Sequence, residues 1–267
     1  MRINKLEKRR DGLYTTKRKP YMIFGEFKHI TVKKVFDFAW EMTFGNIGEH
    51  RNHRSGGSIK RKKGQIFADT FQGKLAECGF YNLMYHYSDI KEPDFEKYDL
   101  GRWDQYDFEV NGKKVAIKST KRFGQLLLLE TKDWTSNGKY KPNLGTEYEE
   151  YDFFVLLRID PACESLLKKN KILYSNNIEK EVLYNIITSE KWAYDIVGYI
   201  SNDDLINIIN NRMIIKKGEF LNGRTKMDAE NYYIQAGDMK DIKELINIIA
   251  DIKSKEIIEG NSIFNIR

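Results

Sequence analysis

The sequence feature that most constrains this chain is residues 106–121, which read YDFEVNGKKVAIKSTK. Two runs of alternating side chains lie on either side of Asn111-Gly112. An Asn-Gly pair in this setting predicts a tight β-hairpin, because both positions of the favoured two-residue turn need a positive φ. Successive side chains of a strand point to opposite faces, so we expect Asp107 and Glu109 on the same face of the first strand.

On the second strand of this hairpin, Ala116 and Lys118 share one face. An acid on one strand and a lysine on its neighbour, beside an apolar ribbon, can form a metal-assisted phosphodiesterase site. The alternative is an ordinary cross-strand ion pair between Asp107 and Lys118. Such a pair contributes less than about 1 kcal/mol to stability at a protein surface.

The charge of the chain is unevenly distributed. Residues 1–63 hold 17 Lys and Arg against 6 Asp and Glu, a net charge of +11, so the other 204 residues carry about −5 of the total of +6. A basic end on a mildly acidic body suggests a polyanion partner, most simply nucleic acid, although a solvated basic tail without a partner remains the alternative. The residues expected to contact DNA are Arg51, Arg54, Lys60, Arg61, Lys62, Lys63, Lys121 and Arg122.

Two histidines, His50 and His53, lie in the same glycine-rich basic loop. They raise the alternative of a His-Asn-His nuclease or a metal pair. That site needs a strand-loop-helix frame with a further histidine downstream, and only His86 follows, after a different kind of segment. We therefore expect both to be loop residues near phosphates.

The rest of the chain predicts one α/β domain. Residues 65–87 and 241–259 have helical apolar periodicity, whereas residues 125–130 and 151–159 are continuous apolar runs typical of central strands buried on both faces. Two cysteines are too few for a disulfide framework, and no apolar run is long enough for a membrane helix. We expect a cytoplasmic protein without a membrane partner.

The order of helix glutamate, strand aspartate, hairpin and strand lysine resembles the PD-(D/E)xK nuclease superfamily, the fold of many type II restriction endonucleases. The matching residues are Glu77 in KLAE, Asp107 in QYDFEV and Lys118 in VAIKST, and the resemblance covers about residues 64–160. It implies a restriction-endonuclease-like α/β fold, with a mixed central sheet flanked by helices. Residues 1–63 would then be a basic, DNA-contacting N-terminal extension, and residues 64–267 a catalytic domain with a C-terminal α/β elaboration.

The resemblance also implies roles for these side chains. Asp107 would ligate Mg²⁺, Glu77 would bind the metal or orient its hydration shell, and the backbone carbonyl of Ile117 would contribute. Lys118 would assist the attacking water. The departure is Ala116, which stands where the family has Asp or Glu and has no ligand atom.

Three explanations of Ala116 compete. The acid was removed deliberately to trap a substrate complex, or it migrated to Glu109 or the more remote Glu130, or the protein gave up catalysis and kept binding. We favour the first, because Lys118 and the rest of the motif are still present. Loss of one of two central carboxylates is expected to weaken Mg²⁺ binding severely.

We therefore expect a Mg²⁺-dependent, site-specific endodeoxyribonuclease of restriction type that acts on double-stranded DNA and is catalytically impaired as written. The resemblance implies a homodimer, since such enzymes commonly act as two-fold dimers on palindromic sites. Residues 131–150 or the C-terminal third would read bases. The alternatives are a non-catalytic nucleic-acid-binding protein on the same fold, and a repair or RNA-processing nuclease.

Overall fold

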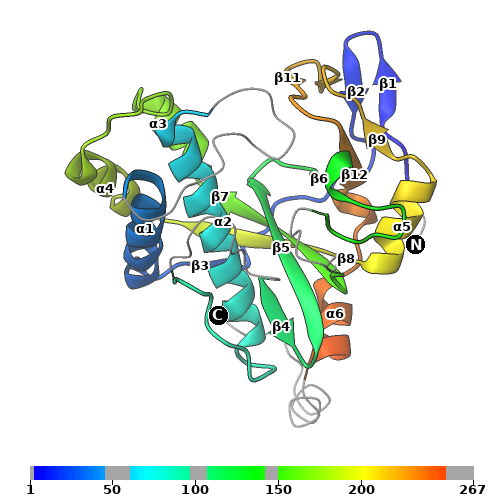
Figure 1. The fold of residues 1–267 in the computed structure, drawn as a ribbon, viewed down its shortest axis with the longest axis horizontal. Helices are drawn as coiled ribbons and strands as arrows, with labels where there is room; N and C mark the ends of the chain where they lie inside the picture. Colours follow the sequence, from blue (N-terminus) through cyan, green and yellow to red (C-terminus); the bar gives the residue numbers. More distant parts are fainter. Residues whose placement is uncertain (1–2, 46–60, 97–106, 142–149, 251–267) are drawn as a thin grey trace.

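A mixed five-stranded sheet lies at the centre of the computed structural model, which describes residues 3–45, 61–96, 107–141 and 150–250 (Figure 1). Its strands follow the order β3-β8-β7-β5-β4. β5 and β7 are parallel, and the other neighbouring pairs are antiparallel. The strands are β3 (Gly25–Glu26), β4 (Phe108–Val110), β5 (Lys113–Lys121), β7 (Phe153–Asp160) and β8 (Ala193–Ser201). The chain is therefore an α/β protein with a mixed central sheet, as the sequence predicts.

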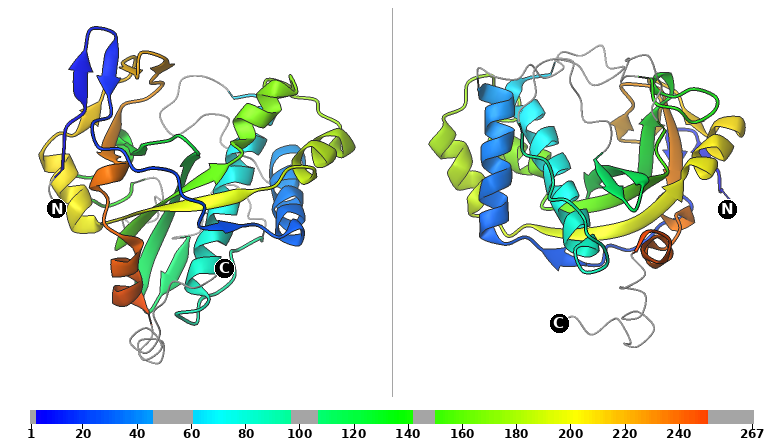
Figure 2. Two further views of the ribbon diagram at one scale, coloured as in Figure 1. Left: turned by 180° about the vertical axis from the view of Figure 1, so that it is seen from behind. Right: turned by 60° about the horizontal axis from the view of Figure 1, so that its bottom comes forward.

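Helices pack with one face of this sheet in the larger apolar cluster, and α1 and α2 lie side by side (Figure 2). The buried odd-numbered residues of β5 and β7, among them Val115 and Val155, belong to this cluster together with Phe67, Phe71 and Leu75 of α2. Their alternation along the strands is what directs them to a single face. The helices are α1 (His29–Phe44), α2 (Lys63–Met84), α3 (Cys163–Lys169), α4 (Lys180–Thr188) and α6 (Ile242–Ile249).

The opposite face carries a second apolar cluster, which includes Ala116 of β5 and Phe154 and Leu156 of β7. A three-stranded sheet, in the order β6-β12-β9, supplies five of its other members, and α5 supplies two. These elements are β6 (Leu126–Glu130), β9 (Ile214–Ile215), β12 (Asn231–Gln235) and α5 (Asn202–Asn210), with short 3-10 turns at Thr131–Asp133 and Ala236–Asp238.

A third, small sheet projects from the body beside this second layer (Figures 1 and 2). Its strand order is β1-β2-β10-β11, and it joins the N-terminal hairpin to a hairpin more than 200 residues later. β2 and β10 are parallel where Leu13 pairs with Leu221. The strands are β1 (Glu7–Arg9), β2 (Gly12–Tyr14), β10 (Phe220–Leu221) and β11 (Thr225–Lys226).

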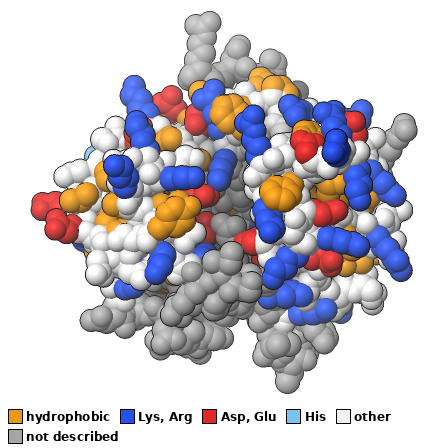
Figure 3. Space-filling view, turned by 90° about the horizontal axis from the view of Figure 1, so that it is seen from above, with side chains coloured by type: hydrophobic (Ala, Val, Ile, Leu, Met, Phe, Trp, Pro, Cys, Tyr) orange, Lys and Arg blue, Asp and Glu red, His pale blue; other side chains and the backbone are white. Residues whose placement is uncertain are grey.

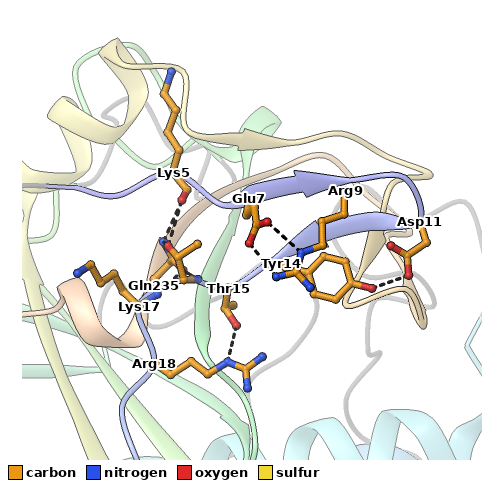
Figure 4. Close-up of polar contacts among 10 residues, drawn as sticks. Lys5, Glu7, Arg9, Asp11, Tyr14, Thr15, Lys17, Arg18 and Gln235 are labelled. Atoms are coloured by element: carbon orange, nitrogen blue, oxygen red, sulfur yellow. Dashed lines mark hydrogen bonds and ion pairs between the residues drawn. The ribbon is translucent and has the colours of Figure 1, made fainter.

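The described N-terminal residues are part of the folded body. Gln235, fully buried on β12, accepts hydrogen bonds from the backbone N–H groups of Thr16 (2.6 Å) and Lys17 (3.0 Å) (Figure 4). It also donates to the carbonyl of Asn4 (2.9 Å). β3 pairs with β8, and α1 shares the core of α2. Residues 3–44 are thus held by the same sheets and core as the rest of the chain.

Most elements form where the sequence predicts them. Asn111 and Gly112 have φ values of 51° and 72°, which confirms the β4–β5 hairpin. α2 confirms the helix predicted over residues 65–87, and every residue of β7 except Asp160 is buried. Of the predicted final helix, residues 242–249 are helical and residues 251–259 lie outside the described part.

One predicted strand forms, but it is not the central, fully buried strand that the sequence predicts. β6 forms where the run QLLLLE predicts a strand, but it is at the edge of the three-stranded sheet and is buried only at alternate residues. Leu127 and Leu129 point into the second cluster, whereas Leu126 and Leu128 are half-buried. No helix among the described residues is long and apolar enough to span a membrane.

Candidate functional site

The candidate site lies just before the first residue of β4, where the pairing between β4 and β5 stops. β4 pairs with the first three residues of β5, and no other described strand pairs with the edge of β5 that faces β4 from Ala116 onward. The N–H of Ile117 points to this edge and donates to Oδ2 of Asp107 (2.6 Å). Because both backbone groups of a strand residue point to the same side, the Ile117 carbonyl lies at this edge as well. The exposed Asp107 carboxylate thus takes the place of a main-chain acceptor.

The register of the hairpin fixes the neighbours of Asp107. Phe108 pairs with Val115, so Asp107 comes opposite Ala116, as the hairpin predicts. Glu109 pairs with Lys114, two residues from Asp107 in the direction of the turn and away from Lys118. That position gives little support to Glu109 as the migrated acid.

Glu77 reaches the site from α2. Its carboxylate is largely buried and forms an ion pair with Lys74 one turn earlier (2.6 Å). Lys74 Nζ also donates to the backbone carbonyl of Asp94 (2.8 Å). The 3.6-residue period of the helix places Gly73 and Glu77 on one side, and both line the same cavity.

This cavity, of about 330 Å³, brings Glu77 together with Ile117 and Lys118. Its remaining walls come from Ser119 and Thr120 of β5 and from leucines of β6 and β7. Lys118 is half-buried, and no acid of the described part of the chain lies within ion-pair distance of its Nζ. The cross-strand Asp107–Lys118 ion pair, considered above as an alternative, does not form.

Ala116 is packed rather than left open. Its side chain is 1% exposed and belongs to the apolar cluster that also contains Leu127, Phe154 and Leu156. A carboxylate at this position would have to lie beside these groups or turn to the edge where Asp107 lies. The packing gives no support to an alanine that merely fills the place of a removed acid.

A larger cleft, of about 820 Å³, continues from the cavity. The two share Ser119, Thr120, Leu126 and Leu128. One wall of the cleft is formed by α2 and the start of α3, and another part of its lining is Leu221, Asn222 and Thr225 of the projecting sheet. Seen from above, Lys and Arg side chains lie on both sides of a central hollow (Figure 3).

The β5–β6 turn presents Phe123 to this cleft, with 81% of the side chain exposed. Arg122 lies 5.4 Å from the centre of the Phe123 ring. We did not anticipate Phe123 as a site residue, although an aromatic side chain between Arg122 and Gly124, five residues after Lys118, is visible in the sequence.

The predicted DNA contacts fall into three groups. The first group, Arg51, Arg54 and Lys60, lies outside the described residues. The second is Lys62, which is exposed, and Lys63, whose Nζ lies 5.3 Å from the centre of the Phe44 ring. The other three form ion pairs, which are Arg61–Asp69 (2.7 Å), Lys121–Glu164 (2.8 Å) and Arg122–Asp160 (2.8 Å). Lys121 and Arg122 line the larger cleft, so they are placed to meet a ligand there.

The oxygen donors of the site are few. The described residues include no group of three or more His, Cys, Asp or Glu that could hold a metal, and His50 and His53 lie outside them. Asp107, Glu77 and the Ile117 carbonyl are hard donors of the kind that Mg²⁺ takes, with water completing its shell. Burial raises the pKa of the neighbouring Cys78 to about 12, so in the absence of a metal this thiol stays protonated.

Comparison with known proteins adds no assignment. No family model matches the chain, and no match was found among curated proteins or solved structures. Function is therefore argued from the site alone.

Proposed function

We propose that this protein is a Mg²⁺-dependent endonuclease of restriction type that hydrolyses phosphodiesters of duplex DNA on a restriction-endonuclease-like fold. The observation that carries the proposal is the cavity bordered by Glu77, Ile117 and Lys118, at the strand edge where Asp107 also lies. An acid-and-lysine edge of this kind suits metal-assisted phosphodiester hydrolysis.

Each group has a role that its position suits. Asp107, Glu77 and the carbonyl of Ile117 would hold a hydrated Mg²⁺, which when bound neutralises the phosphate and polarises it. The Lys118 ammonium would orient the attacking water or donate to a phosphate oxygen. Since no acid of the described residues lies within ion-pair distance of its Nζ, Lys118 can make that contact without breaking an ion pair with any of them.

The larger cleft supports a polymeric substrate. It opens from the cavity and is bordered by Lys121 and Arg122, which can exchange their acidic partners for phosphates. A homodimer on a two-fold related site belongs to the same proposal.

A second candidate is a non-catalytic DNA-binding protein with this fold. The apolar packing of Ala116 is the specific observation that favours it, because a site that keeps one acid fewer holds Mg²⁺ more weakly.

The decisive experiment follows the conversion of supercoiled plasmid, with Mg²⁺ and with EDTA. The wild-type chain is expected to nick or cut the plasmid only with Mg²⁺. Lys118→Ala and Asp107→Asn are each expected to lower the rate about a hundredfold or more, because each removes a group that acts at the reacting phosphate. Lys113→Ala is the matched control, since Lys113 is on the same strand but pairs with Asp152 (2.9 Å) away from the cavity.

The outcomes separate the candidates. Discrete fragments indicate restriction-type cleavage, and a smear indicates repair or degradation. If the chain binds duplex DNA but neither it nor a variant with an acid at position 116 cuts, the non-catalytic reading replaces the enzyme.

A further inference from the structure

The small projecting sheet is strongly basic. We define the basic ribbon as residues 7–14 and 216–226, which comprise β1, β2, β10, β11 and their turns. It holds seven Lys or Arg against three Asp or Glu, a net charge of +4 within a chain of +6. All seven cations are exposed, and they are Lys8, Arg9, Arg10, Lys216, Lys217, Arg224 and Lys226.

Both faces of the basic ribbon meet solvent. All three residues of β1 and both of β11 are exposed, and none of the residues of β2 or β10 is fully buried. Leu13 and Leu221 are its apolar contacts with the second cluster, and a sheet this small has little stability of its own. Its shape therefore depends on how it is attached to the body.

The attachment holds both legs of the N-terminal hairpin. The Gln235 side chain accepts from the N–H groups of Thr16 and Lys17 on one leg and donates to Asn4 on the other. Asn4 also donates from its own side chain to Asp238 (2.6 Å). Figure 4 shows Gln235 between these two legs. The basic ribbon is thus a fixed arm whose orientation is set by β12.

The two hairpin tips are fitted to each other. Asn222 donates its N–H to the carbonyl of Leu13 (2.9 Å), and Tyr14 donates its hydroxyl to Asp11 (2.5 Å). Gly223 has a φ of 65°, and a Cβ there would lie 2.5 Å from the Asp11 carboxylate. Glycine is therefore required both for the turn and for the close approach.

The basic ribbon also forms part of the wall of the larger cleft. Thr15, at its base, and Leu221, Asn222 and Thr225 line the cleft together with the β5–β6 turn. A ligand that fills the cleft and reaches the Lys118 cavity consequently touches the ribbon. Among the described residues, the basic ribbon therefore carries exposed cations on a small sheet and also contacts this cleft.

We propose that the basic ribbon is the element that reads bases, with its two-stranded hairpin β1–β2 in the major groove of duplex DNA. The inference rests on the proposed function and makes it more specific. The major groove is wide enough for a two-stranded β-ribbon, and arginine and lysine are the side chains that most often contact guanine there. Arg10 and Arg224, at the two tips, would reach base edges or phosphates, while the cleft holds the strand to be cut.

The first test measures binding of a fluorescent mixed-sequence duplex of about 30 base pairs by anisotropy, at several salt concentrations. Arg10→Gln/Arg224→Gln is compared with Lys28→Gln/Lys191→Gln, which removes the same charge from exposed lysines outside the ribbon and the cleft lining. The ribbon variant is expected to bind about tenfold more weakly or worse, and to lower the slope of log K against log salt by about 2. The control is expected to retain the wild-type slope.

The second test locates the groove. A duplex with 5-iodouracil in place of thymine carries iodine in the major groove, and irradiation should crosslink it to residues 7–14 or 216–226. Crosslinks confined to other segments, or equal binding by the two double variants, would overturn the ribbon proposal and leave the nuclease proposal standing. If the double variant changes only self-association, the ribbon is an interface between copies. Failure of the wild-type chain to bind any duplex contradicts both proposals.

Discussion

Two cations on one face of the central sheet have opposite surroundings. Lys118 pairs in register with Leu156, and Arg158 with Thr120, so the two are two positions apart on adjacent parallel strands. Arg158 is completely buried and donates to the carbonyls of Lys19 (2.8 Å) and Pro20 (2.7 Å) and to Asp195. Lys118 borders a cavity and contacts no acid among the described residues.

The difference between the two side chains shows which of the two charges the fold itself uses. The Arg158 guanidinium fastens residues 19–20 to β7 and β8, and both of its terminal nitrogens donate to acceptors of the fold itself. Within the part of the chain that the structure describes, the Lys118 ammonium has no such acid acceptor, so its donors can meet a ligand. A half-buried charge without a partner lowers stability, and a functional role is a reason for a protein to keep such a charge. This asymmetry singles out Lys118 rather than Arg158 as a functional cation.

The largest expected effect is on the Arg158 side of the comparison. Arg158→Met leaves Asp195 buried without its partner, so we expect a loss of about 3–5 kcal/mol in the free energy of unfolding, measured by urea denaturation. Lys118→Met, the same substitution on the neighbouring strand, should change it by less than about 0.5 kcal/mol. If Arg158→Met does not fold, Arg158→Met/Asp195→Leu should recover part of the loss. Equal losses for the two single variants would remove the distinction between a structural and a functional cation.

The sequence predicts the local parts of this architecture well. The β4–β5 hairpin follows from Asn111-Gly112, and β7 and α2 follow from apolar runs of the right length and period, because each signal is contained within its own element. The run QLLLLE predicts a strand, but an apolar run does not say which sheet receives it. β6 therefore forms in an unexpected layer, where β12, about 100 residues later, is its partner.

Contacts between distant segments could not be predicted. Gln235 fixes the N-terminal hairpin across more than 200 residues of sequence, and a buried glutamine has no pattern that identifies its partners. The same applies to the site. The spacing of Asp107 and Lys118 indicates a shared hairpin, yet the apolar packing of Ala116 depends on β6 and β7. The acid partners of Lys121 and Arg122 likewise lie about 40 residues away.

The next prediction adds a negative charge at Ala116, on the same strand face as Lys118. Ala116→Glu should lower stability by about 1–3 kcal/mol relative to Ala116→Gln, because it buries a carboxylate of nearly the same shape as the amide. If the new acid turns to Asp107 and binds Mg²⁺, the ion should raise the melting temperature of Ala116→Glu more than that of Ala116→Gln. Mg²⁺-dependent plasmid cleavage should rise with it, and Lys118→Ala should abolish that gain.

The control for this prediction is the metal itself. Ca²⁺ accepts the same oxygen donors but supports a different coordination geometry, so it should stabilise Ala116→Glu without restoring the same cleavage. If Mg²⁺ raises the melting temperatures of the Glu and Gln variants equally, residue 116 does not take part in a metal site. That result would favour the two explanations in which the acid migrated or the protein kept only DNA binding.

The smallest effect concerns an ion pair of intermediate exposure, Asp204–Lys240 (2.6 Å), in which the side chains are 7% and 30% exposed. Asp204 lies in the first turn of α5, where its carboxylate accepts from the N–H and hydroxyl of the N-cap residue Ser201 (both 2.9 Å). Burial raises the pKa of Asp204, but the hydrogen bonds from Lys240 and Ser201 outweigh it and hold the pKa below its usual value.

Because the folded-state pKa is the lower one, Asp204 stabilises the fold above the unfolded pKa of about 4, and this contribution is lost as pH falls through the folded value. Asp204→Asn should therefore cost about 1 kcal/mol at neutral pH and reduce the decline of stability below about pH 4, measured by urea denaturation across pH. Asp152→Asn, which removes the more exposed partner of Lys113, should cost less. A larger cost for Asp152 than for Asp204 would show that burial does not rank the ion pairs of this protein, and the contrast between Arg158 and Lys118 would then need another cause.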